Sequence, residues 1–467
     1  MIRTTRYRAD WVLPVAAPPI RDGAVLVDDY GVIQDVGPNA AVPRPDSADD
    51  ADLGAAIILP GLVNVHTHPE LAGMRGLLED LPFHQWIPAL RSAKEAAALS
   101  ADDFGDSARW ACLEAAAAGI TAIGATEDSG AALEAMRETG LRGIVYREVF
   151  GPAPAQAEPA MARLRERVDA MRRRTTDLVG VGISPHAPYT VSDELFALAA
   201  GYAADEGLPV AVHAAEAEVE AQLVTAGAGP FAAGLRTRGI PTPPRGRSTI
   251  DLLHRTGVLR TRPLLIHCVF VDADDIRRMA DAGAAVAHCP IANARLGQGI
   301  APVIELLEAG VRVGLGTDSV ASGNRVDLLE EARSAQLMQR ARLASAFALP
   351  PDRLLRLATI DGARALGLDR RVGTLEVGKD ADLCAVRIDR PHTRPVIDPV
   401  ATLFMSARGP DVVLTTVRGK VLYRDGAFAT LQPSSLRRRI DAIGERLLGA
   451  RDGGTATAER AAPGGAP

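Results

Sequence analysis

The chain has 467 residues, of which 47% are hydrophobic and 24% charged, and its formal net charge is −6. The length favours one large domain with a smaller satellite, and the composition is that of an ordinary folded protein. The negative charge argues against nucleic acid or an anionic membrane as a partner, since either would favour a basic surface.

Two flanking segments, residues 1–56 and 373–430, are rich in β-type runs and Gly/Asp turns, such as AVLVDDYGVIQDVG. We expect them to pair into one small β domain, a β-sandwich. The chain between them, 57–372, is expected to form the large domain. Residues 431–467 are expected to form a C-terminal helix that ends in a disordered, low-complexity tail.

Within the large domain, short apolar runs alternate with longer amphipathic segments, which is typical of repeated βα units. Eight such units predict an α/β fold, a (β/α)8 barrel of the TIM type. A doubly wound open sheet is the alternative, and the barrel is favoured because polar residues cluster at the C-terminal ends of the runs. The runs are Leu62–His68, Gly119–Gly124, Gly143–Val149, Val179–His186, Leu208–His213, Leu264–Val269, Ala284–Cys289 and Val311–Asp318.

Three helices can be placed between these runs. Ala101–Ala118 follows Ser100, a suitable N-cap, and Asp272–Ala282 follows the sixth run. Residues 325–348 form a long amphipathic stretch after the eighth run.

The four cysteines show no CxxC spacing, so we expect neither a disulfide scaffold nor a thiolate zinc site. The N-terminus lacks the apolar run of a signal peptide, and no stretch reaches the ~18 apolar residues that a membrane span needs. The expected location is the cytoplasm. The cysteines are Cys112, Cys268, Cys289 and Cys384.

Six of the nine histidines lie at the ends of predicted strands, which in a barrel converge on the face where active sites are found. Asp318 ends the eighth run. His84, His254 and His392 lie elsewhere and are interpreted as solvated or packing residues. The six are His66, His68, His186, His213, His267 and His288.

His66 and His68 stand two residues apart in a strand, so their side chains point to the same side. Such a pair alone is more often structural than a ligand pair. Together with His213 and Asp318, however, it makes a set of three imidazoles and one carboxylate. This set suits Zn²⁺ or Fe²⁺ with one position left open for water.

Lysine occurs only at Lys94, Lys379 and Lys420. Two-metal barrels of this kind usually bridge their ions with a carboxylated lysine at a strand end. None of the three lysines ends a predicted strand, so we expect one divalent metal ion.

Glu216 lies three residues beyond His213, at the expected start of the next helix. A carboxylate there can transfer a proton from water to a ring nitrogen, although a glutamate in a first turn also has a structural explanation. His267 can hold an attacking hydroxide, the alternative being a satisfied core imidazole. His186 favours a substrate contact over a structural turn, and His288 stays open between a structural and a supporting role.

With these residues assembled, the chain resembles the amidohydrolase superfamily, in the branch of adenosine- and cytosine-deaminase-like aminohydrolases and s-triazine chlorohydrolases. The resemblance covers nearly all of residues 1–430. It implies His66, His68, His213 and Asp318 as metal ligands, Glu216 as proton shuttle, His267 as the residue that orients hydroxide, and Asp318 also as a base. The motifs are PGLVNVHTH, MRGLLEDLPFHQWI, SPHAPYTVS, VHAAEAE, LIHCVFVDADDI, AHCPIANARLGQGIAPV, GLGTDSVAS and ATIDGARALGLDRRVGTLEVGKDADLCAV.

The reaction implied by the resemblance is hydrolytic deamination of a nitrogen heterocycle. Water attacks the amino-bearing carbon, Glu216 protonates the adjacent ring nitrogen, and ammonia leaves. In dechlorinases of this branch the carboxylate equivalent to Glu216 is often absent or moved, so its presence favours deamination. Dechlorination or another C–N hydrolysis on a triazine- or pyrimidine-type ring remains an alternative, and so does a catalytically silent barrel used for binding.

The 53 residues between His213 and His267 are long for one βα step. This insertion resembles that of 6-amino-6-deoxyfutalosine deaminases of the alternative menaquinone pathway, within a wider likeness to S-adenosylhomocysteine and adenosine deaminases. The implied substrate is an adenine nucleoside with a carboxylated side group. We expect a small-molecule substrate, no nucleic acid and no membrane, and leave a homo-oligomer open.

Substrate contacts are expected from His186 and Glu70, and Arg147 or Arg75 could pair a carboxylate bidentately. Trp86 could stack on a purine, although an aromatic residue near an entrance loop more often packs. One departure concerns the family's TDSxASN run, which here has Gly323 in place of Asn and Asn324 one position later. It predicts a looser loop above the metal.

Overall fold

The structure, a computed structural model, describes residues 3–461. All eight predicted strands of the large domain are present and lie in two parallel sheets, ordered β6-β7-β8-β9 and β10-β11-β12-β13. The sheets meet at both edges, through a bridge between Ile183 and Val210 and through contacts of β13 with β6. The strands are β6 (Leu62–Thr67), β7 (Ile120–Glu127), β8 (Arg142–Val149), β9 (Val179–Pro185), β10 (Ala211–Ala214), β11 (Leu264–His267), β12 (Ala285–His288) and β13 (Arg312–Leu315).

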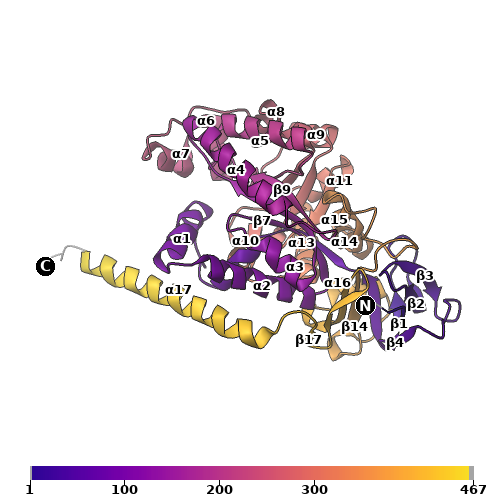
Figure 1. The fold of residues 1–467 in the computed structure, drawn as a ribbon. Coiled ribbons are helices and arrows are strands. Elements are labelled where there is room, and N and C mark those ends of the chain that lie inside the picture. Colours follow the sequence, from indigo (N-terminus) through magenta and orange to yellow (C-terminus); the bar gives the residue numbers. More distant parts are fainter. Residues whose placement is uncertain (1–2, 462–467) are drawn as a thin grey trace.

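Helices surround these strands (Figure 1), and a separate apolar cluster made mainly of the strands' own side chains lies between the two sheets. Every residue of β6, β7 and β8 is buried, which explains why they are continuous apolar runs rather than alternating ones. The helices are α1 (Phe83–Ala96), α2 (Ala101–Ala117), α3 (Ala132–Thr139), α4 (Ala157–Arg172), α5 (Asp193–Glu206), α6 (Glu218–Ala226), α7 (Gly229–Arg236), α8 (Thr249–Arg255), α9 (Ala273–Ala282), α10 (Pro290–Arg295), α11 (Val303–Glu308), α12 (Val320–Gly323), α13 (Leu328–Leu343), α14 (Pro351–Ala358), α15 (Ile360–Ala365), α16 (Pro399–Met405) and α17 (Pro433–Ala461).

The three helices placed from sequence are confirmed as α2, α9 and α13. Ser100 caps α2 in a capping box with Asp103, and Asp272 caps α9. The last helix is shorter than the predicted 325–348, because the side chain of Asp327 caps its N-terminus. Short 3₁₀ turns complete the chain: η1 (Pro69–Met74), η2 (Pro154–Gln156), η3 (Val258–Thr261), η4 (Pro391–Thr393) and η5 (Gly409–Asp411).

The two flanking segments pair with each other, as predicted, in one β-sheet domain. They form one nine-stranded hydrogen-bonded sheet in the order β17-β16-β15-β14-β5-β1-β2-β3, with β4 beside β1. The sheet is continuous because β5 pairs with β1 on one side and with β14 on the other. The strands are β1 (Thr5–Val12), β2 (Ile20–Val27), β3 (Ile33–Pro38), β4 (Asp49–Asp52), β5 (Ala56–Pro60), β14 (Leu383–Arg387), β15 (Val412–Val417), β16 (Lys420–Arg424) and β17 (Ala427–Phe428).

A buried ion-pair cluster connects this sheet to the large domain. Arg142, the first residue of β8, donates to Asp382 (Nε–Oδ2 2.8 Å) and to Asp380 (Nη2–Oδ2 2.7 Å) just before β14. Its side chain is fully buried. A charge held in this way ties the two sheets together at a fixed point.

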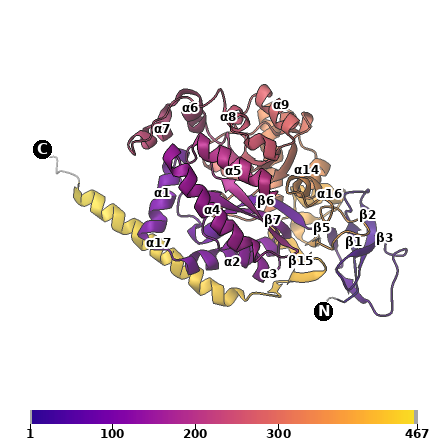
Figure 2. The same ribbon diagram turned by 45° about the horizontal axis from the view of Figure 1, so that its top comes forward.

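The C-terminal helix α17 runs along α1 and α2 and extends beyond them (Figures 1 and 2). Its buried residues Ile443 and Leu447 share an apolar cluster with Leu71 and Met74 of η1. Of the tail expected to be disordered, residues 453–461 continue the helix and residues 462–467 lie outside the described residues. No helix in the described part of the chain is both long and apolar enough to cross a membrane.

Candidate metal centre

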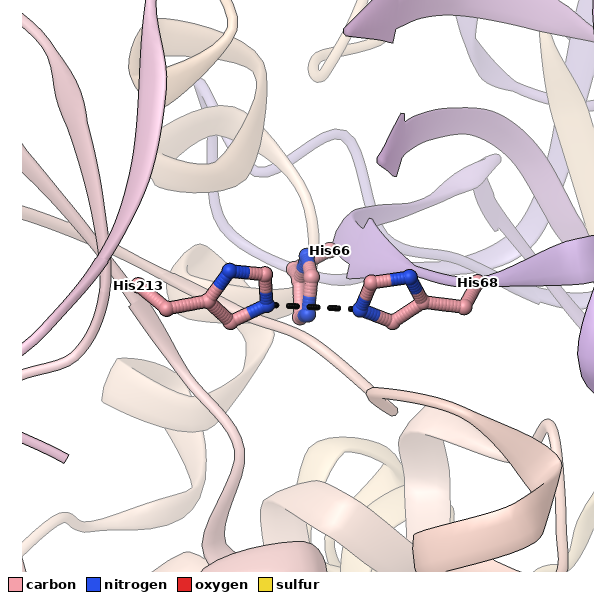
Figure 3. Close-up of side chains that lie close together, drawn as sticks. All are labelled: His66, His68 and His213. Carbon is pink, nitrogen blue, oxygen red and sulfur yellow. Dashed lines mark hydrogen bonds between the residues drawn. The ribbon is translucent and has the colours of Figure 1, made fainter. Parts of the chain in front are cut away.

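Three histidines from two strands converge in the interior, as Figure 3 shows for His66, His68 and His213. One ring nitrogen from each lies within 4.8 Å of the others. The Nε2 atoms of His68 and His213 face each other at 3.3 Å. His66 lies in β6, His68 follows one residue after the end of that strand, and β10 brings His213 from the other sheet.

Asp318 joins this cluster, with its Oδ1 3.3 Å from His66 Nε2 and 3.7 Å from His68 Nε2. The prediction that Asp318 ends the eighth strand is wrong, since β13 stops at Leu315 and Asp318 lies three residues further on, in a turn with φ 54°. Its amide donates to the carbonyl of His66 at 3.1 Å, and Ser322 Oγ donates to its Oδ2 at 2.7 Å. These bonds hold a left-handed residue at a position where strain is often functional.

The donor atoms fit a divalent cation. His213 Nδ1 lies 3.2 Å from the carbonyl oxygen of His186, an arrangement that places the proton on Nδ1 and leaves Nε2 with a free lone pair. His66 Nε2 is buried without a hydrogen-bond partner. Nitrogens bound to one tetrahedral zinc ion at ~2.05 Å lie ~3.3 Å apart, which matches the separation of His68 and His213.

The protonation states of the three histidines and Asp318 also fit a metal site. Burial lowers the pKa of His66, His68 and His213, so these imidazoles are neutral and able to bind a metal. Burial raises the pKa of Asp318, but its close contacts with the histidine rings, His66 above all, outweigh burial and hold that pKa below its ordinary value. The cluster therefore offers three neutral nitrogens and one carboxylate.

Glu216 is buried beside the cluster, in the loop between β10 and α6. Gln298 Nε2 donates to its Oε1 at 2.8 Å, and Tyr189 Oη donates to its Oε2 at 3.2 Å. Burial and the charge of Asp318 raise the pKa of Glu216 to about 8, against the lowering effect of these two hydrogen bonds. A carboxyl group with this pKa can both hold and release a proton near neutral pH.

His267 lies on the other side of Glu216, with its Nε2 3.3 Å from Glu216 Oε1. Its Nδ1 is 2.8 Å from Asn293 Oδ1, which fixes the ring. The sequence did not single out Asn293, Gln298 or Tyr189. All three stand in motifs that carried the family resemblance, but nothing in their spacing indicated that they reach these side chains.

A group of buried acidic side chains adjoins the histidines. His186 Nε2 lies 3.8 Å from Glu148 Oε1, and its Nδ1 lies 2.7 Å from Thr190 Oγ1. Arg147 pairs with Glu127 at 3.6 Å. Burial raises the pKa of Glu70, whose Oε2 is buried without a partner. His186 thus lies between Glu148 and His213, whereas Arg147 points to the other face of β8 and pairs with Glu127 and Asp128.

Two other expected substrate contacts have packing partners. Arg75 pairs with Glu114 and donates to the carbonyl of Asn324. Trp86 is buried in an apolar cluster with Phe83 and Leu71.

Asn324 also determines the loop above the cluster. Its side chain accepts from the amide of Gly76 at 2.9 Å and donates to Glu79 at 2.7 Å. The loop that was expected to be loosened by Gly323 is therefore tied to the chain after η1.

The sequence also drew attention to His288, the three lysines and the four cysteines. His288 is buried at the end of β12 with no hydrogen-bond partner for either nitrogen, and burial lowers its pKa to about 3. None of the three lysines ends a strand of the large domain, since Lys94 lies in α1, Lys379 precedes β14 and Lys420 lies in β16. All four cysteines are buried and unpaired.

Comparison with known proteins gives this geometry a family. The amidohydrolase family matches residues 57–422. The chain is 33% identical to the 5-methylthioadenosine/S-adenosylhomocysteine deaminase of Moorella thermoacetica over 434 residues, which cover 92% of this chain and 96% of that protein.

Two solved structures are similar over nearly the whole chain. An adenosine deaminase from Xanthomonas campestris with bound zinc superposes with a TM-score of 0.84 at 28% identity, covering 95% of this chain and 98% of that one. The atrazine chlorohydrolase of Arthrobacter aurescens complexed with zinc gives 0.82 at 25% identity, covering 94% and 99%. From the match over residues 57–422 and the relative that is one-third identical, we conclude that the chain belongs to the amidohydrolase family.

Proposed function

We propose that the protein is a metal-dependent aminohydrolase that deaminates the adenine ring of a nucleoside and releases ammonia. The observation that carries this proposal is the buried Glu216 carboxyl, held beside the histidine cluster with its pKa raised to about 8. The relatives support the same substrate class, because the deaminases of Moorella and Xanthomonas act on adenine nucleosides by name.

His66, His68, His213 and Asp318 would hold the metal ion, and the two zinc-bound relatives favour zinc. When bound, such an ion acts as a Lewis acid and lowers the pKa of water. Asp318 is suited to accept the proton of that water, because its carboxylate stays ionised in the site.

Glu216 is the proposed proton donor to the ring nitrogen next to the reacting carbon. Gln298 and Tyr189 orient its carboxyl group by hydrogen bonds at 2.8 and 3.2 Å. His267, fixed by Asn293, would stabilise the charge that develops on the attacking oxygen. Each of these side chains is buried, so water does not compete for the proton at Glu216.

His186, Glu70 and Arg147 are the proposed contacts to the rest of the nucleoside. His186 is supported by its position beside His213, and Glu70 by a buried carboxylate oxygen that has no partner. Arg75 and Trp86 are less suited to this role, because both already have packing partners. A carboxylated nucleoside such as 6-amino-6-deoxyfutalosine, and with it a place in menaquinone biosynthesis, is a finer proposal that rests on Arg147.

The finer description of the fold is likewise a proposal. The contacts at both edges of the two four-stranded sheets support a closed (β/α)8 barrel. We further propose 57–372 as the catalytic domain and 1–56 with 373–430 as the small β domain.

An ammonia-release assay across a panel of compounds tests the function. The panel contains adenosine, 5′-methylthioadenosine, S-adenosylhomocysteine, 6-amino-6-deoxyfutalosine, guanine, cytosine and a chlorotriazine. We expect ammonia from one or more of the adenine nucleosides. Chloride release from the chlorotriazine without ammonia from any nucleoside would favour the alternative that the chlorohydrolase likeness suggests.

A further inference from the structure

Glu220 lies at the centre of a hydrogen-bond network around the turn that carries Glu216. It stands in the first turn of α6, and its side chain is fully buried. Its Oε1 accepts from the amide of Ala215 at 2.8 Å, and its Oε2 accepts from the amide of Glu216 at 3.0 Å. Because one carboxylate binds two successive amides, it fixes the peptide from which the Glu216 side chain departs.

The backbone of this turn needs such support. Ala215 has φ 51°, a left-handed conformation that is strained for a residue with a Cβ. On its other side, the carbonyl of Ala215 accepts from the amides of Val269 and Phe270, both at 2.8 Å. The turn is therefore held between the end of β11 and the carboxylate of Glu220.

A third bond connects Glu220 to the insertion between β10 and β11. Thr249, the first residue of α8, donates its hydroxyl to Glu220 Oε1 at 2.5 Å and is itself buried. No lysine or arginine pairs with Glu220 within residues 3–461, so the partners of this buried carboxylate are two amides and one hydroxyl. Glu220 therefore does not stabilise the domain through an ion pair.

We propose that Glu220 is a positioning residue for Glu216, and that Thr249 couples the insertion to this turn. The inference rests on the proposed function, in which Glu216 must direct its carboxyl group at the ring nitrogen. Glu220 does not reach the substrate; it sets the peptide that aims Glu216. The insertion then contributes to catalysis through α8, whatever substrate contacts it makes.

Chemistry explains why a carboxylate is required at position 220. Both of its oxygens face donors, so an amide in its place would turn an NH₂ group toward one of the two backbone N–H groups. Glu220→Gln therefore keeps the shape of the side chain but breaks one support of the turn. Glu218→Gln is the matched control. It makes the same substitution two residues away, at a position on the exposed face of α6.

The test compares four variants: Glu220→Gln, Glu218→Gln, Thr249→Val and Thr249→Ser. Each is assayed for kcat and KM of ammonia release from 5′-methylthioadenosine, for metal content, for Tm, and for hydrogen exchange of the amides of Ala215 and Glu216. For Glu220→Gln we expect kcat to fall about 10- to 100-fold, the range typical of groups that orient a catalytic residue. KM and metal content should change little, and exchange at the two amides should accelerate.

Thr249→Val should show the same changes in kcat and hydrogen exchange, but smaller ones. Thr249→Ser should behave like the wild type, because serine keeps the hydroxyl. Glu218→Gln should match the wild type in every measurement. A folded, metal-loaded Glu220→Gln protein with wild-type kcat would overturn the proposal, as would a fall in kcat that is matched by loss of metal. If Glu220→Gln does not fold, the Thr249 pair decides by the same criteria.

Failure of the proposed function gives a different result. If the wild type releases no ammonia from any compound, the exchange measurement alone tests Glu220. Faster exchange at Ala215 and Glu216 in Glu220→Gln, but not in Glu218→Gln, would still support the positioning role. Unchanged exchange would refute it.

Discussion

Among single residues, Glu216 is the side chain on which the proposed deamination depends. Its neighbours Gln298, Tyr189 and His267 all contact the carboxyl group, and none of the four is open to solvent. In the proposed function, this carboxyl group holds and releases the proton that the ring nitrogen receives.

Replacing Glu216 with Gln should keep the metal and lower kcat about 10²- to 10⁴-fold, the usual contribution of a general acid or base. The amide preserves the shape and can still bond to Gln298, but it cannot transfer the proton. Steady-state kinetics and elemental analysis measure the two effects. Near-wild-type kcat in a metal-loaded variant would remove Glu216 from the mechanism.

The raised pKa of Glu216 also predicts a pH dependence of stability in the metal-free protein. With a pKa of about 8 when folded and about 4.3 when unfolded, the folded state binds more protons between these values. Stability from this group is therefore lost as pH rises through about 8, by up to ~1.4 kcal/mol per pH unit. The neighbouring histidines, whose pKa values are lowered, contribute no dependence above pH 7.

Tm of the metal-free protein, measured from pH 7 to 9, tests this dependence. The wild type should lose stability over that range, and Glu216→Gln should lose less because its amide does not titrate. Equal slopes for the two proteins would show that Glu216 is not protonated in the folded state.

At the scale of elements, the junction between the two sheets depends on Arg142. Replacing it with Leu would leave Asp382 buried without its cation, which costs about 3–5 kcal/mol, while Asp380 keeps its pair with Arg371. Arg91→Ala is the control, since its pair with Glu95 is exposed and contributes little. Denaturant unfolding should show a large loss for the first variant only. Equal stability of the two variants would contradict the proposed junction.

The helix α17 supports the turn that follows His68. Ile443 is buried against η1, where a Cβ added to Gly73 would come within 2.9 Å of its Cγ2. Ile443→Ala should lower the free energy of unfolding by about 2–5 kcal/mol, the cost of truncating a buried aliphatic side chain. Leu448→Ala, at a half-exposed position of the same helix, should cost much less. A negligible loss for Ile443→Ala would indicate that α17 is not part of the folded core.

At the scale of the whole molecule, the sequence predicted the eight parallel strands, because fully buried strands leave continuous apolar runs. The same runs located His66, His68 and His213, since side chains at strand ends converge. The sequence placed Asp318 at the end of the eighth strand, but β13 ends three residues before it, at Leu315. The left-handed turn that carries Asp318 leaves no periodic signal in the sequence. The contacts of Gln298, Asn293 and Glu220 depend on how loops meet, which periodicity does not encode.

The small domain shows the same limit at larger scale. The sequence predicted that the two ends of the chain pair, and the antiparallel pairing of β5 with β14 confirms this. It did not predict the order of the nine strands, because strand order is decided by pairing between segments that lie far apart in the chain.

Three histidines and one aspartate are proposed to hold a single divalent ion. Elemental analysis of the purified wild-type protein, with a variant in which His66 and His68 are both replaced by Ala, measures whether they do. We expect about one tightly bound ion per wild-type chain, most of it zinc, and none in the variant. Two ions per chain, or equal metal in both proteins, would contradict it.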